Sequence, residues 1–140
     1  MEVTEHRPKL VSFRALAFHG ENKGQANRGD EWTLELAQEI KLGLAVPMVS
    51  GAPVQAVVKI DLRAKSANTS ALSDSAEFSA TYEAKFDCPS YVTEEELSSW
   101  FEDEPYQYML ASQSFPLAMT HFRRELQSMG FDARSLPLGL

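Results

Sequence analysis

Three stretches of the chain alternate between apolar and polar residues with the two-residue period of a half-buried strand. In 32–46 the large apolar residues fall on even positions and the charged residues on odd positions, and the same parity returns in most of 54–65 and throughout 78–88. A first strand is predicted over 10–18, but its apolar residues occupy both parities, so its inward face stays open. The pattern predicts a four-stranded antiparallel sheet with one apolar face.

Two helices are predicted after the last strand. Thr93 followed by Glu96 is typical of a capping box and predicts a short helix through Phe101. A second, amphipathic helix is predicted from about Ser114 to Gly130, with Pro116 in its first turn and a Schellman-type stop at its end. Its apolar stripe consists of Ala118, Phe122, Leu126 and Met129.

Strands followed by helices indicate one α+β domain over 1–140, with both helices packed on one face of the sheet. Its expected parts are a flexible N-terminus (1–9), the sheet (10–88), the helices (93–130) and an extended tail (131–140). The segments 19–30 and 66–75 are expected to be long exposed connections because they are rich in Gly, Asn and Ser.

A comparison of sizes predicts a surplus of apolar surface. Four strands span about 19 Å and a 15-residue strand about 50 Å, whereas a 16-residue helix is only about 24 Å long. Two short helices would leave part of the apolar face for other copies of the chain or for a partner. A strongly coiled sheet that folds over itself is the alternative.

Composition narrows the function classes. A net charge of −7 disfavours a nucleic-acid partner, and no apolar run is long enough to span a membrane, so a cytoplasmic protein is expected. The single cysteine, Cys88, falls on the apolar parity and is expected to be a buried structural thiol. His6, His19 and His121 lack metal-site spacing. We therefore expect no enzyme, no metal and no cofactor. The acidic run over 94–104 reads as a solvated surface or as a docking patch for a basic partner.

Several segments, in order, resemble the SecB-like chaperone family. They are 10–14 and 39–44, which resemble the first two strands, and 78–86, which resembles the fourth. The most specific is 114–130, which resembles the family's aromatic-Pro helix opening, Arg-Glu pair and Gly-ended helix, followed by Leu-Pro-Leu at 136–138. Segment 93–97 is similar to a segment found in the toxin–antitoxin-associated branch of that family.

This resemblance implies an ATP-independent chaperone, a holdase, assembled as a tetramer that is a dimer of dimers. Such proteins bind unfolded or aggregation-prone clients in apolar grooves, in protein folding, protein transport (export) or antitoxin stabilisation. Carried over by position, the client-binding residues are Ile40, Leu42 and Leu44 on the second strand and Phe122 and Leu126 on the long helix. Phe78 and Tyr82 would lie near the subunit contacts.

The chain also departs from the export branch of that family. Arg14 stands where an acid is expected, and Ser79 and Thr81 replace the fourth-strand residues that dock the motor ATPase SecA. No counterpart of the motor-binding tail follows the last helix. SecA docking is therefore doubtful, and an antitoxin or viral client is plausible. The alternative is a dedicated interaction or inhibitor protein, for example viral, that binds one folded partner through the acidic run and 19–30.

Overall fold

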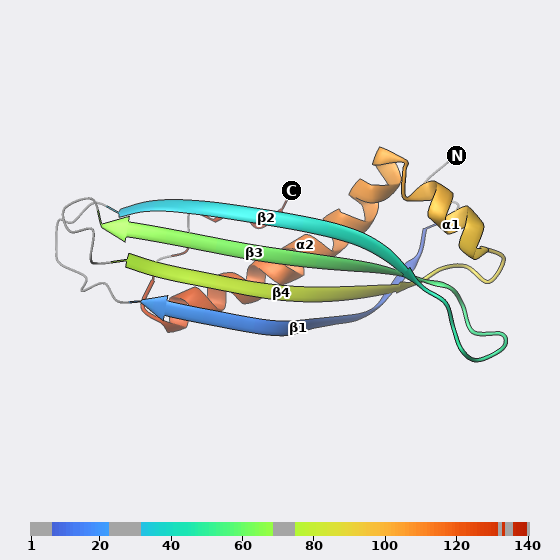
Figure 1. Cartoon of the computed structure of the whole chain (residues 1–140), viewed down its shortest axis with the longest axis horizontal. Helices are drawn as coiled ribbons and strands as arrows, with labels where there is room; N and C mark the ends of the chain where they lie inside the picture. Colours follow the sequence, from blue (N-terminus) through green and yellow to red (C-terminus); the bar gives the residue numbers. More distant parts are fainter. Residues whose placement is uncertain (1–6, 23–31, 69–74, 132, 134–135, 140) are drawn as a thin grey trace.

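The computed structural model describes residues 7–22, 32–68, 75–131, 133 and 136–139. Figure 1 shows one antiparallel sheet in the order β1-β4-β3-β2, followed by two helices. This confirms the predicted α+β class. The elements are β1 (Lys9–Asn22), β2 (Trp32–Ala45), β3 (Gln55–Asn68), β4 (Ser75–Asp87), α1 (Glu94–Trp100) and α2 (Glu104–Ser128).

The predicted connections are shorter than expected where they can be described. β1 continues to Asn22 and β3 to Asn68, and β4 already begins at Ser75. The remainders of the expected loops, 23–31 and 69–74, lie outside the described residues, as does most of the expected flexible N-terminus.

Even- and odd-numbered residues of β3 and β4 lie on opposite faces of the sheet, one buried and one facing solvent. The even-numbered residues over 56–66 and 76–86 are buried, including Ile60 and Tyr82, which pair across the two strands. On the opposite face Thr81 donates a hydrogen bond to Asp61 (2.7 Å), and Lys65 lies 3.6 Å from Glu77. The alternation read from the sequence therefore gives the correct inward face for these strands.

Two β-bulges determine which side chains of β1 point toward the core. Its register with β4 shifts between Leu10 and Ser12 and again between Ala15 and Ala17. Each extra residue reverses the inward parity, and the residues left at the two shifts, Val11 and Leu16, are exposed. Phe13 then stacks on Tyr82, with ring centroids 5.7 Å apart.

The long helix begins ten residues earlier than predicted, at Glu104 rather than Ser114. The Asp103 side chain accepts a hydrogen bond from the Tyr106 backbone N–H (3.2 Å), and Pro105 occupies the first turn. Pro116 lies inside the helix, so the prediction that it begins the helix was wrong. With 25 residues, α2 is about 37 Å long.

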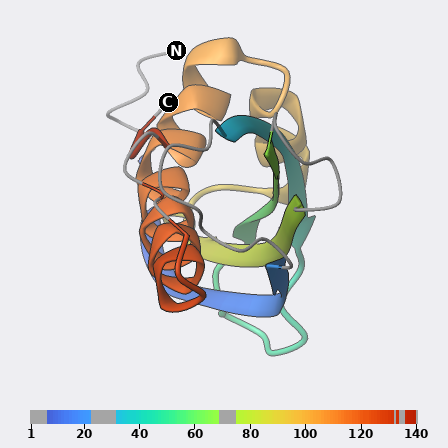
Figure 2. The same cartoon turned by 90° about the vertical axis from the view of Figure 1, so that its left-hand side faces the viewer.

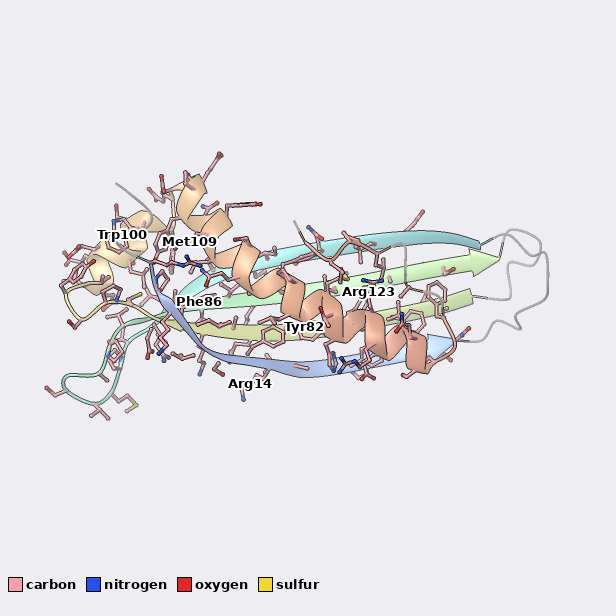
Figure 3. The ribbon with its side chains drawn as sticks, turned by 180° about the vertical axis from the view of Figure 1, so that it is seen from behind. Arg14, Tyr82, Phe86, Trp100, Met109 and Arg123 are labelled. Carbon is pink, nitrogen blue, oxygen red and sulfur yellow. The ribbon has the colours of Figure 1, made fainter. Side chains whose placement is uncertain are left out.

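This longer helix covers most of the apolar face. Figure 3 shows α2 crossing the sheet diagonally above Tyr82, and Figure 2 shows it against one side of the curved sheet. The buried core includes the inward residues of β3 and β4 together with the inner stripe of α2. The predicted surplus of apolar surface was therefore overestimated on β3 and β4, because the helix that shelters them was taken to be too short.

The described residues after α2 add to this cover. Gly130 has a positive φ of +81°, and the Phe131 N–H donates to the Leu126 carbonyl (3.0 Å), which confirms the predicted Schellman stop. The Phe131 ring packs on Phe78 at 5.6 Å, and Arg123 donates to the carbonyl of Ala133 (3.1 Å). Leu136 is also buried in the core.

Replacing Leu136 with aspartate is expected to lower the free energy of unfolding by about 2–3 kcal/mol, because it removes a buried leucine and places a carboxylate on an apolar surface. Urea unfolding measures this loss. Leu138→Asp is the matched control, since Leu138 is exposed two residues further on. Equal stability of the two variants would show that the tail contributes nothing to the fold.

Candidate functional site

The apolar face remains partly open along the two edge strands of the described sheet, β1 and β2. Leu36, Ile40, Leu42 and Leu44 are half-buried, whereas their neighbours on β3 are fully covered. This difference has a geometric cause: α2 packs against β1, β3 and β4, while α1 packs against β2. β2 is also an edge strand, paired only with β3. Half-exposed apolar side chains therefore lie beside a sheet edge.

A concavity of about 530 Å³ lies between β2 and the start of α2. We call it the β2–α2 groove. Its floor comes from Ile40 and Leu42, and Tyr108, which is 59% exposed, stands at its side. The other lining residues are Phe101, Glu104, Gln107 and Ala111. The lining residues that belong to α2 have the spacing i, i+3, i+4, i+7, which places them on one face of the helix: Glu104, Gln107, Tyr108 and Ala111.

An aromatic cluster holds the helix junction behind this groove. The ring of the buried Tyr106 lies 5.6 Å from Trp100 and 6.4 Å from Phe101. Gln107 donates a side-chain hydrogen bond to the Phe101 carbonyl. Figure 3 shows Trp100 and Met109 at this end of the molecule. These contacts fix the angle between α1 and α2, and with it the width of the groove.

Cys88 lies in the same buried region and is a poor nucleophile. The thiol is buried as the sequence predicted, and burial raises its pKa above the ordinary value. A protonated thiol is a poor nucleophile. In the described residues, no group of three or more His, Cys, Asp and Glu side chains is placed to hold a metal ion. The groove offers apolar contact and backbone hydrogen bonds rather than reactive groups.

The charges near the groove are acidic. Glu104 is one of its lining residues, and the first turn of α1 carries Glu94, Glu95 and Glu96, with no basic residue in its last turn. All four carboxylates are exposed. Water therefore solvates these carboxylates. The floor of the groove, formed by Ile40 and Leu42, carries no charge.

A larger concavity, of about 830 Å³, lies on the polar face at the far end of the sheet. Arg63 and Lys65 line it together with three acids, Glu21, Glu35 and Glu77. Lys65 and Glu77 form an exposed ion pair there, and such pairs contribute little to binding or stability. This surface has the character of a solvated sheet face, so the smaller apolar groove is the better candidate site.

The structure divides the predicted site residues into two groups. Ile40 and Leu42 line the groove, and Leu44 follows them on the same strand, half-exposed. Phe122 and Leu126 are fully buried between α2 and the sheet, so neither is accessible to a client in this conformation. Both belong to the core, and the proposed site below leaves them out.

The two residues predicted for subunit contacts are buried as well. Phe78 packs against Phe18 and Phe131, and the Tyr82 hydroxyl hydrogen-bonds to His121 Nδ1 (2.8 Å). Neither side chain reaches the surface of the protomer. Phe78 and Tyr82 are therefore not carried forward as contact residues.

Sequence reasoning missed the groove residues that come from the helices. Tyr108 was not singled out because 104–113 was not predicted to be helical, and Phe101 was identified only as the end of the short helix. Asp103 followed by Pro105 was the available indication of a helix start, and it would have placed Tyr108 on the same face as Ala111.

Comparison with known proteins supports the fold. A scan against protein-family models gives no match, and a search of curated proteins gives none. Among solved structures, the chain is similar to the Mycobacterium tuberculosis Rv1957 SecB-like chaperone, solved in complex with a ChAD peptide from the Rv1956 HigA1 antitoxin. The TM-score is 0.63 at 17% identity, over 94% of this chain and 90% of that chain.

The protein has a SecB-like fold. The resemblance seen in the sequence is thus confirmed for the architecture, which is what a likeness at 17% identity shows. The SecB-like sheet and helices frame the β2–α2 groove. None of the described helices is long and apolar enough to cross a membrane.

Proposed function

We propose that this protein is an ATP-independent holdase that binds extended, unfolded or aggregation-prone polypeptide in the β2–α2 groove. The observation that carries the proposal is the half-exposed apolar face of an edge strand, β2, opening into a groove beside aromatic residues. The SecB-like fold supports it, since the similar M. tuberculosis chaperone was solved with an antitoxin peptide.

Binding follows from the chemistry of the groove. An extended client has its side chains alternating between two faces, so every second residue can enter the groove. Its backbone can pair with the free edge of β2 while apolar side chains leave water on Ile40, Leu42 and Tyr108. No step of this binding needs a nucleotide, and the client is released by mass action.

The proposal includes a cellular setting and an assembly. The protein acts in the cytoplasm as a homo-oligomer, a dimer of dimers, and an antitoxin is one client of the right kind. Val11 and Leu16 are exposed apolar residues on β1, outside the groove, which favours self-association. Protein transport through SecA is left out because Ser79 and Thr81 replace its docking residues.

Replacing Tyr108 with serine is expected to weaken binding of an unfolded client about tenfold, because a large aromatic contact is lost from the groove. The measurement is suppression of light scattering by reduced insulin chains, together with the dissociation constant of a labelled unfolded peptide. Ile40→Ser tests the floor of the groove.

Tyr91→Ser is the matched control for Tyr108→Ser. Tyr91 is 57% exposed, against 59% for Tyr108, and it lies outside the groove before α1. The control is expected to hold clients as the original protein does. If Tyr108→Ser and Ile40→Ser both fold and hold clients as well as the control, the groove is not the binding site.

A second candidate function is inhibition of one folded partner with a basic surface. It is favoured by the exposed acids of α1, which lack any basic residue in the last turn of that helix. An unrelated unfolded protein separates the two functions. A holdase loses its bound partner to this competitor, whereas a dedicated inhibitor keeps its partner.

A further inference from the structure

The β2–β3 hairpin ends in an exposed apolar tip. We call residues 46–49 the hairpin tip. Met48 is 102% and Val49 is 72% exposed, and Val46 is exposed as well. Figure 1 shows this hairpin projecting beyond the end of the sheet. The protomer leaves Met48 uncovered and covers Val46 and Val49 only in part, although contact of apolar side chains with water is unfavourable.

The hairpin tip is also uncharged. No Asp, Glu, Lys or Arg occurs between Lys41 and Lys59, in a chain in which 24% of the residues are charged. The absence of Lys and Arg within the tip weakens the attraction that anionic lipids exert on membrane-binding loops, although Arg7 and Lys9 line a concavity with residues 51–53 of the hairpin, together with Asp87. It also removes the charge pairs that usually set the choice of one fixed partner.

β2 leads directly from the groove to this tip. Leu42 lines the groove, Leu44 is half-buried, and the strand ends at Ala45, one residue before Val46. From Leu42 to Met48 the chain advances six residues, which is about 20 Å when extended. A client segment that lies along β2 and extends beyond the groove by this length would reach the tip.

The chemistry of the tip suits an unfolded chain. A side chain as exposed as Met48 can be contacted from several sides, which a flexible segment can do by wrapping. Methionine adapts its shape to different neighbours and recurs on surfaces that bind varied sequences. The turn contains Gly51 at a φ of +88°, and the Ala52 N–H donates to the Val49 carbonyl across it (3.2 Å).

We propose that the hairpin tip is a second contact for the same unfolded client segment, so that one apolar segment of about ten residues or more spans the groove and the tip. This inference rests on the proposed function of the groove. Its consequence is a dependence on client length: short segments fill the groove alone, whereas longer ones also bury Met48 and Val49.

Two labelled peptides test this proposal. The short one is apolar and has six residues, and the long one contains the same sequence lengthened to fifteen residues in total. In the extended conformation they are about 20 Å and 50 Å long. The double variant Met48→Ser/Val49→Ser is expected to weaken binding of the long peptide about tenfold and to change binding of the short one less than twofold. Tyr108→Ser is expected to weaken both. Leu138→Ser, an exposed apolar change after α2 and outside the groove and the tip, is expected to alter neither.

Each of the other possible results contradicts either the tip proposal or the proposed function of the groove. If the tip variant binds the long peptide normally while Tyr108→Ser weakens both peptides, the tip proposal fails and the groove stands. If Tyr108→Ser changes neither peptide, or neither peptide binds the original protein, the proposed function fails too. If the tip variant changes only the oligomer mass in light scattering, or only binding to anionic phosphatidylserine vesicles, the tip serves a second copy or a membrane instead.

Discussion

Replacing Phe122 with alanine is expected to lower the free energy of unfolding by about 3–5 kcal/mol. The ring is fully buried beneath α2 and meets Phe18 edge-on, with centroids 6.2 Å apart. Truncation removes this contact and leaves a cavity that neither a 25-residue helix nor the sheet can close. Urea unfolding followed by circular dichroism measures the loss.

Leu117→Ala is the control on the same helix. Leu117 is exposed, so its truncation is expected to change the free energy of unfolding by less than about 0.5 kcal/mol. The pair of variants also tests the role first assigned to Phe122. A Phe122→Ala protein that keeps its stability but loses client binding would return Phe122 to the binding site and contradict its place in the core.

The sequence predicted the sheet well where the chain follows one rule throughout. The alternation of apolar and polar residues identified the inward faces of β3 and β4, because successive side chains of a strand point to opposite faces. The same rule failed on β1 for a physical reason. An extra residue at Val11 and another at Leu16 reverse the parity twice within one strand, and no local composition marks either bulge.

The candidate site was predicted in part, for a different reason. Ile40 and Leu42 follow from the pattern of β2 alone, and they do line the groove. Phe122 and Leu126 carry the same apolar chemistry on a helix, yet they are core residues. The sequence cannot separate groove from core when both need apolar side chains, because the difference depends on where α2 crosses the sheet.

In a Cys88→Ala background, the free energy of unfolding is expected to fall by about 3 kcal/mol per pH unit above pH 10, because two tyrosines are buried. Burial raises the pKa of Tyr82 and of Tyr106 above the ordinary value, with the charge of Glu125 a smaller cause for Tyr82 and that of Cys88 for Tyr106. In the unfolded chain both phenols ionise near pH 10, whereas the folded protein still holds both protons. Rising pH then favours the unfolded state, by about 1.4 kcal/mol per unit for each tyrosine.

Urea unfolding between pH 8 and 11 measures this slope. Removing the hydroxyl of one tyrosine at a time tests whether Tyr82 and Tyr106 cause it. In Tyr82→Phe the hydrogen bond to His121 is lost, and the slope above pH 10 is expected to halve because Tyr106 alone remains. Tyr91→Phe and Tyr108→Phe, on exposed rings, are expected to keep the full slope. A Cys88→Ala background removes the thiol, whose pKa burial also raises, so that its own loss of stability does not add to the tyrosine slope. If Tyr82→Phe keeps the full slope in that background, Tyr82 ionises in the folded state as freely as in water, and its burial beneath α2 would be contradicted.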